Sequence, residues 1–459
     1  MPLVLRNYTP VTEARLQKPD DGDWMMNRRT YDGWGYSPLT QITPANVGRL
    51  KPVWSFSTGA INGHEAAPIV HDGVMFVATP GSQVIAIEAA TGTVLWRYRR
   101  PLAPTVINRH PTTRGVGLLG DKVFLAASDA VLMALDARTG RTVWTTTVAD
   151  NRSGHYMSLA PLVANGKVLV GTSGGELGIR GFIAAYDPDT GKELWRTYTV
   201  PAPGEPGSES WPKGGDQWKT GGGSVWVTAN YDPETNLAYW GTGNGGPWMG
   251  DQRPGDNLYT SSTIAIDVAT GKIKGHFQYT PNESFDWDEV SPPILVDFQR
   301  NGRTIKGLVD VARDGYMRVA YRRSCQTSRS TCPAGAPAFA PRASAGEPTV
   351  IDAGVCACRS GAMYFASRFP SLNSASARRV ASSSLAPPAT SSRQRSSRCW
   401  ASSSTISCSR AGERRRDDKR GRTCSVQLRM FISGHASHSR DKRVPRLPLL
   451  GEDALALGR

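Results

Sequence analysis

Acidic and amide side chains stand in three short strings of the sequence where they could hold a cation or a proton. Asp286 and Asp288 lie in FDWDEV, Glu176 lies in SGGELGIRG, and Asn244 lies in GTGNGGPW. Their oxygen atoms are the donors that hard cations prefer, and neighbouring glycines let the backbone approach a ligand closely. A carboxylate can also take up a proton during a reaction. Each string has an ordinary interpretation as well, since acidic runs are typical of solvated loops and Asn or Glu beside glycine is typical of turns.

The elements that must position these strings are set by a repeated segment. It occurs three times with a final Trp, as AIEAATGTVLW (86–96), ALDARTGRTVW (134–144) and AYDPDTGKELW (185–195), and once without it, as AIDVATGKIKG (265–275). In the full copies a β-rich run ends in an acidic turn, Thr-Gly reverses the chain, and the Trp follows. Gly supplies the positive φ that such turns need, and β-branched and aromatic residues suit a pleated surface. The spacing of 48 and 51 residues between the first three Thr-Gly pairs indicates a propeller blade or another repeat array.

Short alternating strands fill the chain from Leu50 to residue 319, with Gly, Asp and Pro turns between them. Helical periodicity is nearly absent outside the stretch VTEARL. We therefore predict an all-β fold, a partial β-propeller with about four blades, in which Trp54 is the docking Trp of a preceding blade. The expected organisation is a lead-in segment at 1–49, propeller repeats at 50–319 and a tail at 320–459.

The composition of the chain changes abruptly after residue 319. Residues 320–459 hold 24 of the 54 Lys and Arg residues and 8 of the 39 Asp and Glu residues, so this tail has a net charge of +16 and the preceding residues have −1. All 7 cysteines lie in the tail, whereas 12 of the 13 tryptophans precede it. The basic character of the chain therefore belongs to the tail, and we expect no nucleic-acid partner for the propeller.

Three interpretations of the tail compete. An Arg- and Ser-rich disordered arm could bind RNA or acidic partners, which a steep salt dependence of binding would reveal. A cysteine-bearing domain is a weaker interpretation, because spacings such as Cys356-x-Cys358 match no zinc pattern. We favour out-of-frame translation of a GC-rich gene, which yields Arg, Ser, Ala and Pro in excess, and we expect the tail to be disordered. Reading the other two frames after codon 319 should then restore a Thr-Gly repeat with its Trp; if neither does, the tail is genuine.

A series of strings in a fixed order relates the propeller to a known family. NGHEAAP, TTRGVGL, SGGELGIRG, GGGSVW, GTGNGGPW and FDWDEV occur in the order found in quinoprotein alcohol dehydrogenases of the methanol/ethanol type. The chain resembles this family over about residues 8 to 319, and its Trp-ended repeat is similar to the family's tryptophan-docking motif. The resemblance implies an eight-bladed propeller that uses pyrroloquinoline quinone (PQQ) and a metal ion.

The resemblance also assigns residues to the quinone site. It implies that Trp226 is the aromatic floor on which the quinone stacks, although such a Trp is otherwise typical of a blade core. Arg313 in VARDG is similar to the arginine that reaches the quinone oxygens, where positive charge stabilises the reduced form. The remaining polar contacts implied for the quinone are Glu65, Arg114, Ser158, Ser173 and Ser224.

The metal site and the catalytic base are implied in the same way. Glu176, Asn244 and Asp286 match the family's metal ligands, and Asp286 also matches its catalytic base. Asp288 occupies a position that is acidic in members that use lanthanides and is typically not acidic in calcium-dependent members. The resemblance thus implies Ca²⁺ or a lanthanide ion, and Asp288 is either a ligand of a lanthanide or a cap of a turn. If it is a ligand, Asp288→Ala should lower lanthanum-dependent turnover.

The sequence departs from the family pattern at two points. Where many members carry two adjacent cysteines over the quinone, this chain has Asn108 and Arg109, so no disulfide is expected there. After GLVDVARDGYMRV the next Thr-Gly and Trp repeat does not follow, and the later blades with their cofactor contacts are not expected. An incomplete propeller leaves a sheet face unclosed, so we expect this chain to fold poorly or to bind PQQ weakly.

The resemblance implies an enzyme that oxidises a small alcohol to an aldehyde and passes electrons to a cytochrome c. The alternative is a non-enzymatic propeller scaffold of the outer-membrane assembly lipoprotein type, because similar repeats occur there and fold alone does not decide function. A scaffold has no need of a quinone floor and metal ligands together, and it would carry a lipoprotein signal, which is not recognised here. Family members are periplasmic, although neither a signal peptide nor a transmembrane segment is recognised in this sequence.

Overall fold

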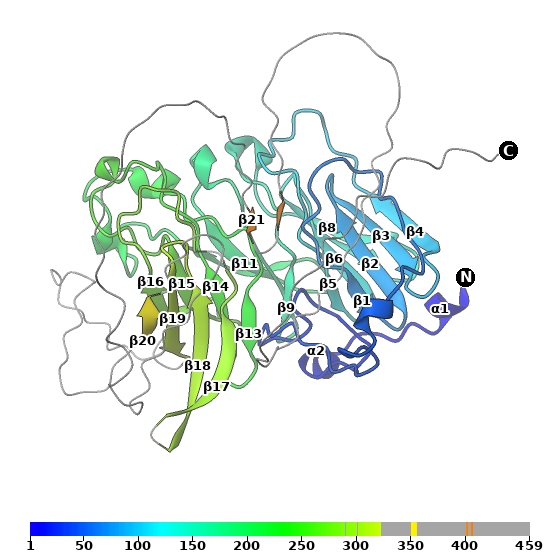
Figure 1. Ribbon diagram of the computed structural model, residues 1–459. Coiled ribbons are helices and arrows are strands. Elements are labelled where there is room, and N and C mark those ends of the chain that lie inside the picture. The colour runs from blue at the N-terminus through cyan, green and yellow to red at the C-terminus, as the bar shows by residue number, and fades with distance from the viewer. Residues whose placement is uncertain (290, 301, 323–349, 356–400, 403–404, 407–459) are drawn as a thin grey trace, which may run out of the picture.

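The structure of the chain, a computed structural model, describes residues 1–289, 291–300, 302–322, 350–355, 401–402 and 405–406. Over these residues the chain is almost entirely β, with five four-stranded antiparallel sheets and one two-stranded sheet. Figure 1 shows the five larger sheets following one another in chain order across the molecule. We name them blades 1 to 5. The all-β propeller fold predicted from the alternating strands is confirmed.

Consecutive strands pair within each blade. Blade 1 contains β1 (Ile69–His71), β2 (Val74–Thr79), β3 (Gln83–Glu88) and β4 (Val94–Arg99). Blade 2 contains β5 (Gly117–Leu119), β6 (Lys122–Ala126), β7 (Val131–Asp136) and β8 (Thr142–Thr147). Blade 3 contains β9 (Leu162–Ala164), β10 (Lys167–Gly171), β11 (Phe182–Tyr186) and β12 (Glu193–Tyr198). Blade 4 contains β13 (Asn230–Asp232), β14 (Leu237–Gly241), β15 (Ser262–Asp267) and β16 (Ile273–Gln278). Blade 5 contains β17 (Ile294–Arg300), β18 (Arg303–Val311), β19 (Tyr316–Tyr321) and β20 (Val350–Val355).

The remaining elements are short. The two-stranded sheet consists of β21 (Ala401–Ser402) and β22 (Thr405–Ile406), and the α-helices are α1 (Leu3–Arg6) and α2 (Glu13–Gln17). The 3₁₀ helices are η1 (Val47–Arg49), η2 (Asn151–Ser153), η3 (Gly175–Leu177), η4 (Ser208–Ser210), η5 (Gln217–Thr220) and η6 (Gly250–Gln252). No helix within the described residues is long and apolar enough to cross a bilayer.

Five blades are present where the sequence predicted about four. The repeat missed blade 5 because no Thr-Gly pair with a following Trp occurs after residue 275. Blade 5 takes its fourth strand, β20, from the tail, where β20 pairs antiparallel with β19. β21 and β22 also lie in the tail, for which the sequence predicted no ordered structure. The other residues beyond 322 lie outside the described residues, so the prediction that they are disordered also concerns residues outside the described part of the chain.

The Thr-Gly turns have the geometry that the repeat predicts. In blade 2, Asp136 Oδ1 accepts a hydrogen bond from the backbone N–H of Thr139 at 2.8 Å. Gly140 adopts a φ of 69°, a left-handed conformation that a side chain would strain. Asp187 and Asp267 hold the turns of blades 3 and 4 with the same kind of bond. The acidic residue and the glycine therefore act together to reverse the chain between the third and fourth strands.

Each Trp of the repeat docks on the turn of the following blade. Trp96 Nε1 donates to the Ala137 carbonyl at 2.9 Å, and its ring covers Gly140, where a Cβ atom would lie 2.5 Å from Trp96 Cε3. The same contacts join Trp54 to Ala89 and Gly92, Trp144 to Pro188 and Gly191, and Trp195 to Val268 and Gly271. Trp54 is therefore the docking Trp that the sequence predicts ahead of blade 1. The tryptophan-docking interpretation of the repeat is confirmed.

The apolar core runs through the middle strands of the blades. In β3, Val84, Ile85, Ala86 and Ile87 are all buried, and the equivalent strands β7 and β11 are buried in the same way. Removing such side chains from water is the main favourable term in folding. Blades 4 and 5 share a smaller, separate cluster that consists of Leu237, Tyr239, Ala265, Leu295 and Leu308.

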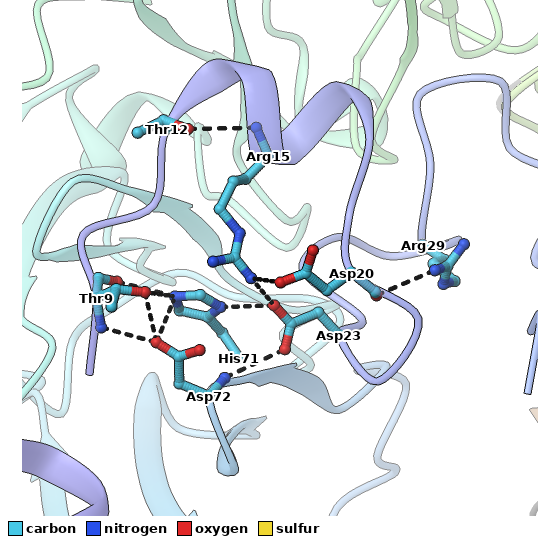
Figure 2. Close-up of polar contacts among 8 residues, drawn as sticks. All are labelled: Thr9, Thr12, Arg15, Asp20, Asp23, Arg29, His71 and Asp72. Carbon is cyan, nitrogen blue, oxygen red and sulfur yellow. Dashed lines mark hydrogen bonds and ion pairs between the residues drawn. The ribbon is translucent and has the colours of Figure 1, made fainter. Parts of the chain in front are cut away.

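The lead-in segment is fixed to blade 1 by a buried polar cluster, which Figure 2 shows. His71, at the end of β1, is fully buried. Its Nδ1 lies 2.9 Å from Asp23 Oδ2, and its Nε2 lies 2.9 Å from the Thr9 carbonyl oxygen. Arg15 of α2 lies 2.8 Å from the same Asp23 oxygen. Two parts of the lead-in segment, around Thr9 and Asp23, therefore meet on one imidazole.

The contacts of this imidazole favour its charged form. Its Nδ1 faces the Asp23 carboxylate, and its Nε2 faces the Thr9 carbonyl and the Asp72 carboxylate, so a hydrogen on each nitrogen is favoured. Burial alone would lower the pKa of His71, but the hydrogen bonds to Asp23 and Thr9 and the carboxylates of Asp23 and Asp72 raise it overall. Among the described residues, Asp23, His71 and Asp72 are the only three His, Cys, Asp or Glu residues whose donor atoms lie within 4.8 Å of one another. Since neither nitrogen keeps a free lone pair, we interpret the cluster as an ionic anchor and not as a metal site.

Candidate active site

Trp226 lies at the centre of the residues that the sequence assigned to a site. It follows η5 and precedes β13, and its indole is half-buried. The Arg114 guanidinium covers the ring, with its Cζ 4.6 Å from the ring centroid. On the ring edge, Trp226 Nε1 donates to Asp288 Oδ2 at 3.1 Å. The ring is therefore held at its edge by a buried carboxylate, and the Arg114 guanidinium stacks on one of its faces.

Polar residues from four connecting segments of the chain converge beside this indole. Arg114 Nη2 lies 2.6 Å from Glu65 Oε2, and Arg114 Nη1 donates to Ser158 Oγ at 2.7 Å. Ser158 Oγ and Ser173 Oγ are 3.0 Å apart and buried. The structure thus brings together Glu65, Arg114, Ser158 and Ser173, which the sequence assigned to quinone contacts. Their fork of donors and hydroxyl groups suits a ligand that carries carboxylates.

Asn244 provides a buried oxygen without a hydrogen-bond partner. Its side chain is buried, its Nδ2 donates to the Gly245 carbonyl, and no described residue donates to its Oδ1. An acceptor left unpaired in a protein interior costs about 1–3 kcal/mol, which a bound cation would offset. The Asn244 backbone N–H donates to Asp288 Oδ1 at 2.6 Å. The donor chemistry of Asn244 therefore fits a metal ligand.

Ser224 and Gly175, the residue that precedes Glu176, lie next to Asn244. A Cβ atom on Gly175 would lie 3.1 Å from Ser224 Oγ and 3.6 Å from Asn244 Oδ1. Glu176 follows directly, in η3, and its side chain is exposed. Its negative charge contributes to the raised pKa values of Asp286 and Asp288. The predicted ligands Glu176 and Asn244 therefore border the same space.

Asp286 and Asp288 differ in their surroundings. Burial raises the pKa of Asp286, Arg313 opposes this shift, and Glu176 adds to it. Burial raises the pKa of Asp288 to about 7, against the opposing effects of the Asn244 N–H and Arg313. Arg313 Nη1 donates to the Asp286 carbonyl at 2.8 Å, and its Nη2 lies 3.8 Å from Asp288 Oδ2. One arginine therefore contacts both residues from the turn between β18 and β19.

The acidic residues of the predicted metal site are not gathered as a closed ligand set. The carboxylate oxygens of Glu176, Asp286 and Asp288 do not all lie within 4.8 Å of one another. Both oxygens of Asp288 accept hydrogen bonds, from Trp226 and from the Asn244 backbone, which is a structural role that the sequence left open beside metal binding. Ligation by all three carboxylates therefore stays a prediction.

Sequence reasoning missed two residues of this region. Tyr156 is buried, and burial together with the charge of Glu176 raises its pKa. Thr172, next to Ser173, has a buried hydroxyl with no hydrogen-bond partner among the described residues. Neither carried a signal, because a Tyr or Thr in a β-rich string is typical of an ordinary strand. Asn108, at one of the two positions where many family members carry a cysteine, has another buried oxygen with no hydrogen-bond partner among the described residues.

The class of protein is defined by a tryptophan-docked β-propeller that carries a half-buried indole surrounded by polar side chains. The family described as "PQQ: Glucose/ethanol/alcohol dehydrogenase, beta-propeller domain" matches residues 24–326. The chain belongs to this family of PQQ-dependent alcohol dehydrogenases, as the ordered strings predict.

Curated relatives and solved structures agree with this assignment. The chain is 40% identical to the quinoprotein alcohol dehydrogenase PedH of Pseudomonas putida, over 68% of this chain and 55% of that protein. It is 38% identical to the lanthanide-dependent methanol dehydrogenase of Methylacidiphilum fumariolicum, over 68% of this chain and 55% of that protein. A europium-containing methanol dehydrogenase structure matches with a TM-score of 0.65 and 36% identity, over 68% of this chain and 58% of that one. The chain thus spans about half the length of the curated relatives it matches.

Proposed function

We propose that this chain forms the PQQ- and metal-binding part of a dehydrogenase that oxidises a small alcohol to an aldehyde and passes the electrons to a cytochrome c. The observation that carries the proposal is the buried, unpaired Asn244 Oδ1, which adjoins a stacking indole and a buried carboxylate. Relatives named as alcohol dehydrogenases support the substrate class. The cytochrome c acceptor is supported by the name of the related methanol dehydrogenase [cytochrome c] subunit 1 of Methylorubrum extorquens.

The quinone site follows from the contacts around the indole. Trp226 would supply the stacking surface, which buries a large apolar face of a planar ligand. Arg114 now covers this face at 4.6 Å, so a ligand on the same face would replace the guanidinium and could pair with it through a carboxylate. Glu65, Ser158, Ser173 and Ser224 would orient the polar rim of the ligand. Arg313, at the turn of blade 5, would stabilise negative charge that develops on the quinone oxygens.

The metal site uses hard oxygen donors. Glu176, Asn244, Asp286 and Asp288 would hold Ca²⁺ or a lanthanide ion, and a trivalent ion suits three carboxylates better than a divalent one does. When bound, PQQ would accept the hydride that leaves the alcohol carbon with its bonding electron pair, and the metal would act as a Lewis acid. A nearby cation would also favour the ionised form of Asp288, whose pKa burial raises to about 7.

Asp286 is the proposed base. Its carboxylate would take the proton from the alcohol hydroxyl while the hydride leaves the adjacent carbon, which together give the aldehyde. Burial raises the pKa of Asp286 and so makes it a stronger base than an exposed aspartate. Arg313 holds the Asp286 carbonyl at 2.8 Å and thereby fixes the backbone from which this carboxylate projects.

We also propose a periplasmic location, where a cytochrome c acceptor is available.

Direct binding tests the proposal. The purified full chain should show quenching of Trp fluorescence by PQQ in the presence of La³⁺ or Ca²⁺, and it should reduce an artificial dye with ethanol. Asn244→Ala should weaken La³⁺ binding by about tenfold or more, because it removes the donor, whereas the exposed Asn62→Ala should not. A binding constant for La³⁺ that is equal in both variants would refute the role of Asn244.

The scaffold alternative makes a different prediction. A chain that melts cooperatively but binds neither PQQ nor metal would exclude the enzyme and favour the scaffold. A cooperative melt whose midpoint rises with PQQ and metal would instead contradict our expectation that this chain folds poorly, because a ligand stabilises only a folded state that binds it.

A further inference from the structure

Arg253 is an arginine with no exposed surface in the long loop between Asn244 and Asp286. Its Nε donates to the Pro247 carbonyl at 2.8 Å, and its Nη2 donates to the carbonyls of Trp248 and Glu283. Its Nη1 donates to Asn257 Oδ1 at 2.6 Å. Among the described residues, every one of these hydrogen-bond acceptors is an uncharged carbonyl or amide oxygen. The guanidinium is therefore used as a fixed fork of donors and not as half of an ion pair.

Burial of this charge carries a cost. Burial lowers the pKa of Arg253, and only the nearby charge of Glu283 opposes the shift. A guanidinium nevertheless stays protonated in proteins, so the charge is retained without a hydrogen-bonded carboxylate. Such a group is poor evidence for a gain in stability, and conformational specificity is the better hypothesis for its presence. The question is which parts of the chain the fork holds together.

The fork joins the two segments that carry the proposed metal ligands. Gly245 directly follows Asn244, and a Cβ atom on Gly245 would lie 2.4 Å from Arg253 Cζ. Only a glycine lets the backbone beside Asn244 lie so close to the guanidinium. On the other side, Arg253 Nη2 reaches the carbonyl of Glu283, three residues before Asp286. One side chain thus contacts the chain next to Asn244 and the chain just ahead of Asp286.

Two asparagines close this arrangement around Arg253. Asn282 Nδ2 donates to the carbonyls of Gly250, Arg253 and Gly255, at 3.1, 3.0 and 3.0 Å. Asn257 Nδ2 donates to the Arg253 carbonyl at 2.8 Å. Asn257 and Asn282 both adopt positive φ angles, 58° and 48°. The loop after Asn244 and the segment before Asp286 are therefore tied to each other at several points, and Arg253 lies at the middle of the network.

We propose that Arg253 is a positioning residue that fixes the spacing between Asn244 and the Asp286–Asp288 segment, and that it thereby sets the affinity of this site for a metal ion. The inference rests on the proposed function, because it takes these residues as metal ligands. Arg253 itself touches no proposed ligand atom in its hydrogen bonds, and it acts through the backbone on which the ligands stand. Lysine cannot replace it, because an ammonium is a point charge and does not present a planar fork.

The test compares Arg253→Lys and Arg253→Met with a control at another buried arginine. Arg322→Met removes a guanidinium that pairs with Asp232 and Asp297, so it destabilises the chain without touching the loop. Binding of Eu³⁺ by the full chain is measured by luminescence, and hydrogen exchange is measured in peptides that cover 245–253 and 282–288. We expect both Arg253 variants to weaken Eu³⁺ binding at least tenfold and to speed exchange in both peptides together. Arg322→Met should change Eu³⁺ binding less than twofold and leave exchange in these peptides unchanged.

The outcomes separate this inference from the proposed function. Exchange in the two peptides that stays at the wild-type rate in Arg253→Lys and Arg253→Met would overturn the positioning role, whatever the metal does. Faster exchange with Eu³⁺ affinity within twofold of wild type would overturn the link between the network and the metal site. If the wild-type chain binds no Eu³⁺, both the metal site of the proposed function and its link to the Arg253 network are overturned. The exchange data would still decide whether Arg253 holds the two segments together.

Discussion

Gly140→Ala should destabilise the chain far more than a change of one methyl group suggests. Gly140 has a φ of 69°, and an L-residue in that region costs about 1–2 kcal/mol. The new Cβ atom would also lie 2.5 Å from Trp96 Cε3 and 2.7 Å from Trp96 Cδ2, so the indole must move. Overpacking of this kind costs about 1–3 kcal/mol, and loss of the Trp96–Ala137 hydrogen bond adds about 1 kcal/mol. The free energy of unfolding should therefore fall by about 3–6 kcal/mol.

Gly120→Ala is the matched control for this prediction. Gly120 lies in the same blade with a φ of 59°, and a Cβ atom there would have no other atom within 4 Å. Only the backbone cost applies, so the free energy of unfolding should fall by about 1–2 kcal/mol. The difference between the two variants isolates the docking of Trp96. Urea unfolding followed by far-UV circular dichroism measures both values, and equal losses would refute the idea that the indole requires a bare glycine.

Three further predictions concern titration and catalysis. The pKa of His71 is raised in the folded chain, so its stabilising effect is present below its unfolded pKa of 6.5 and is lost as the pH rises through the folded pKa. Wild type should therefore lose its stability advantage over His71→Asn on the alkaline side. A difference in urea midpoint that stays constant between pH 6 and pH 9 would contradict the charged anchor. Burial raises the pKa of Asp288 from 3.8 to about 7, so metal-free wild type should lose up to about 4 kcal/mol of stability as the pH rises between these values. In thermal melts, Asp288→Asn should show a flatter dependence of stability on pH, even though it loses one of the two hydrogen bonds. Parallel pH profiles of the two proteins would exclude the buried acid. Asp286→Asn should lower kcat by about 10²–10⁴ with PQQ binding retained, as measured by dye reduction and fluorescence quenching; kcat within tenfold of wild type would exclude Asp286 as the base.

The repeat predicted the Thr-Gly turns, and the resemblance to the family's tryptophan-docking motif implied that each Trp docks. The pairing of Trp96 with the glycine of the next blade, Gly140, came from the structure. Blade 5 could not be counted this way, because the chain after residue 275 has no Thr-Gly pair and Trp. Its strands satisfy only the weaker alternation signal, and its last strand lies in the tail, where the composition gave no reason to expect one.

The candidate site divides in a similar way. The resemblance brought Trp226, Arg114 and Ser158 together, and the structure places them in contact. The two hydrogen bonds that Asp288 accepts depend on how loops of blades 3, 4 and 5 meet, which no local pattern encodes. The buried position of Arg253 could not be predicted for a different reason. An arginine in a polar, glycine-rich loop is expected at the surface, and only the folded loop reveals that carbonyl oxygens surround it.

The indole contacts give the series of blades a direction. Blades 1 to 3 each offer a Trp to the blade that follows, and blades 2 to 4 each receive one, so these blades are joined in one order and not in the reverse. The directional contact favours the correct orientation of neighbouring blades while the chain folds. At the boundary between blades 4 and 5 this directional contact is absent, because Gly275 occupies the position of the docking Trp. There blades 4 and 5 meet through the apolar cluster around Tyr239 and through polar contacts, which include the hydrogen bond from Tyr279 to Asp310 and the ion pair of Arg322 with Asp232.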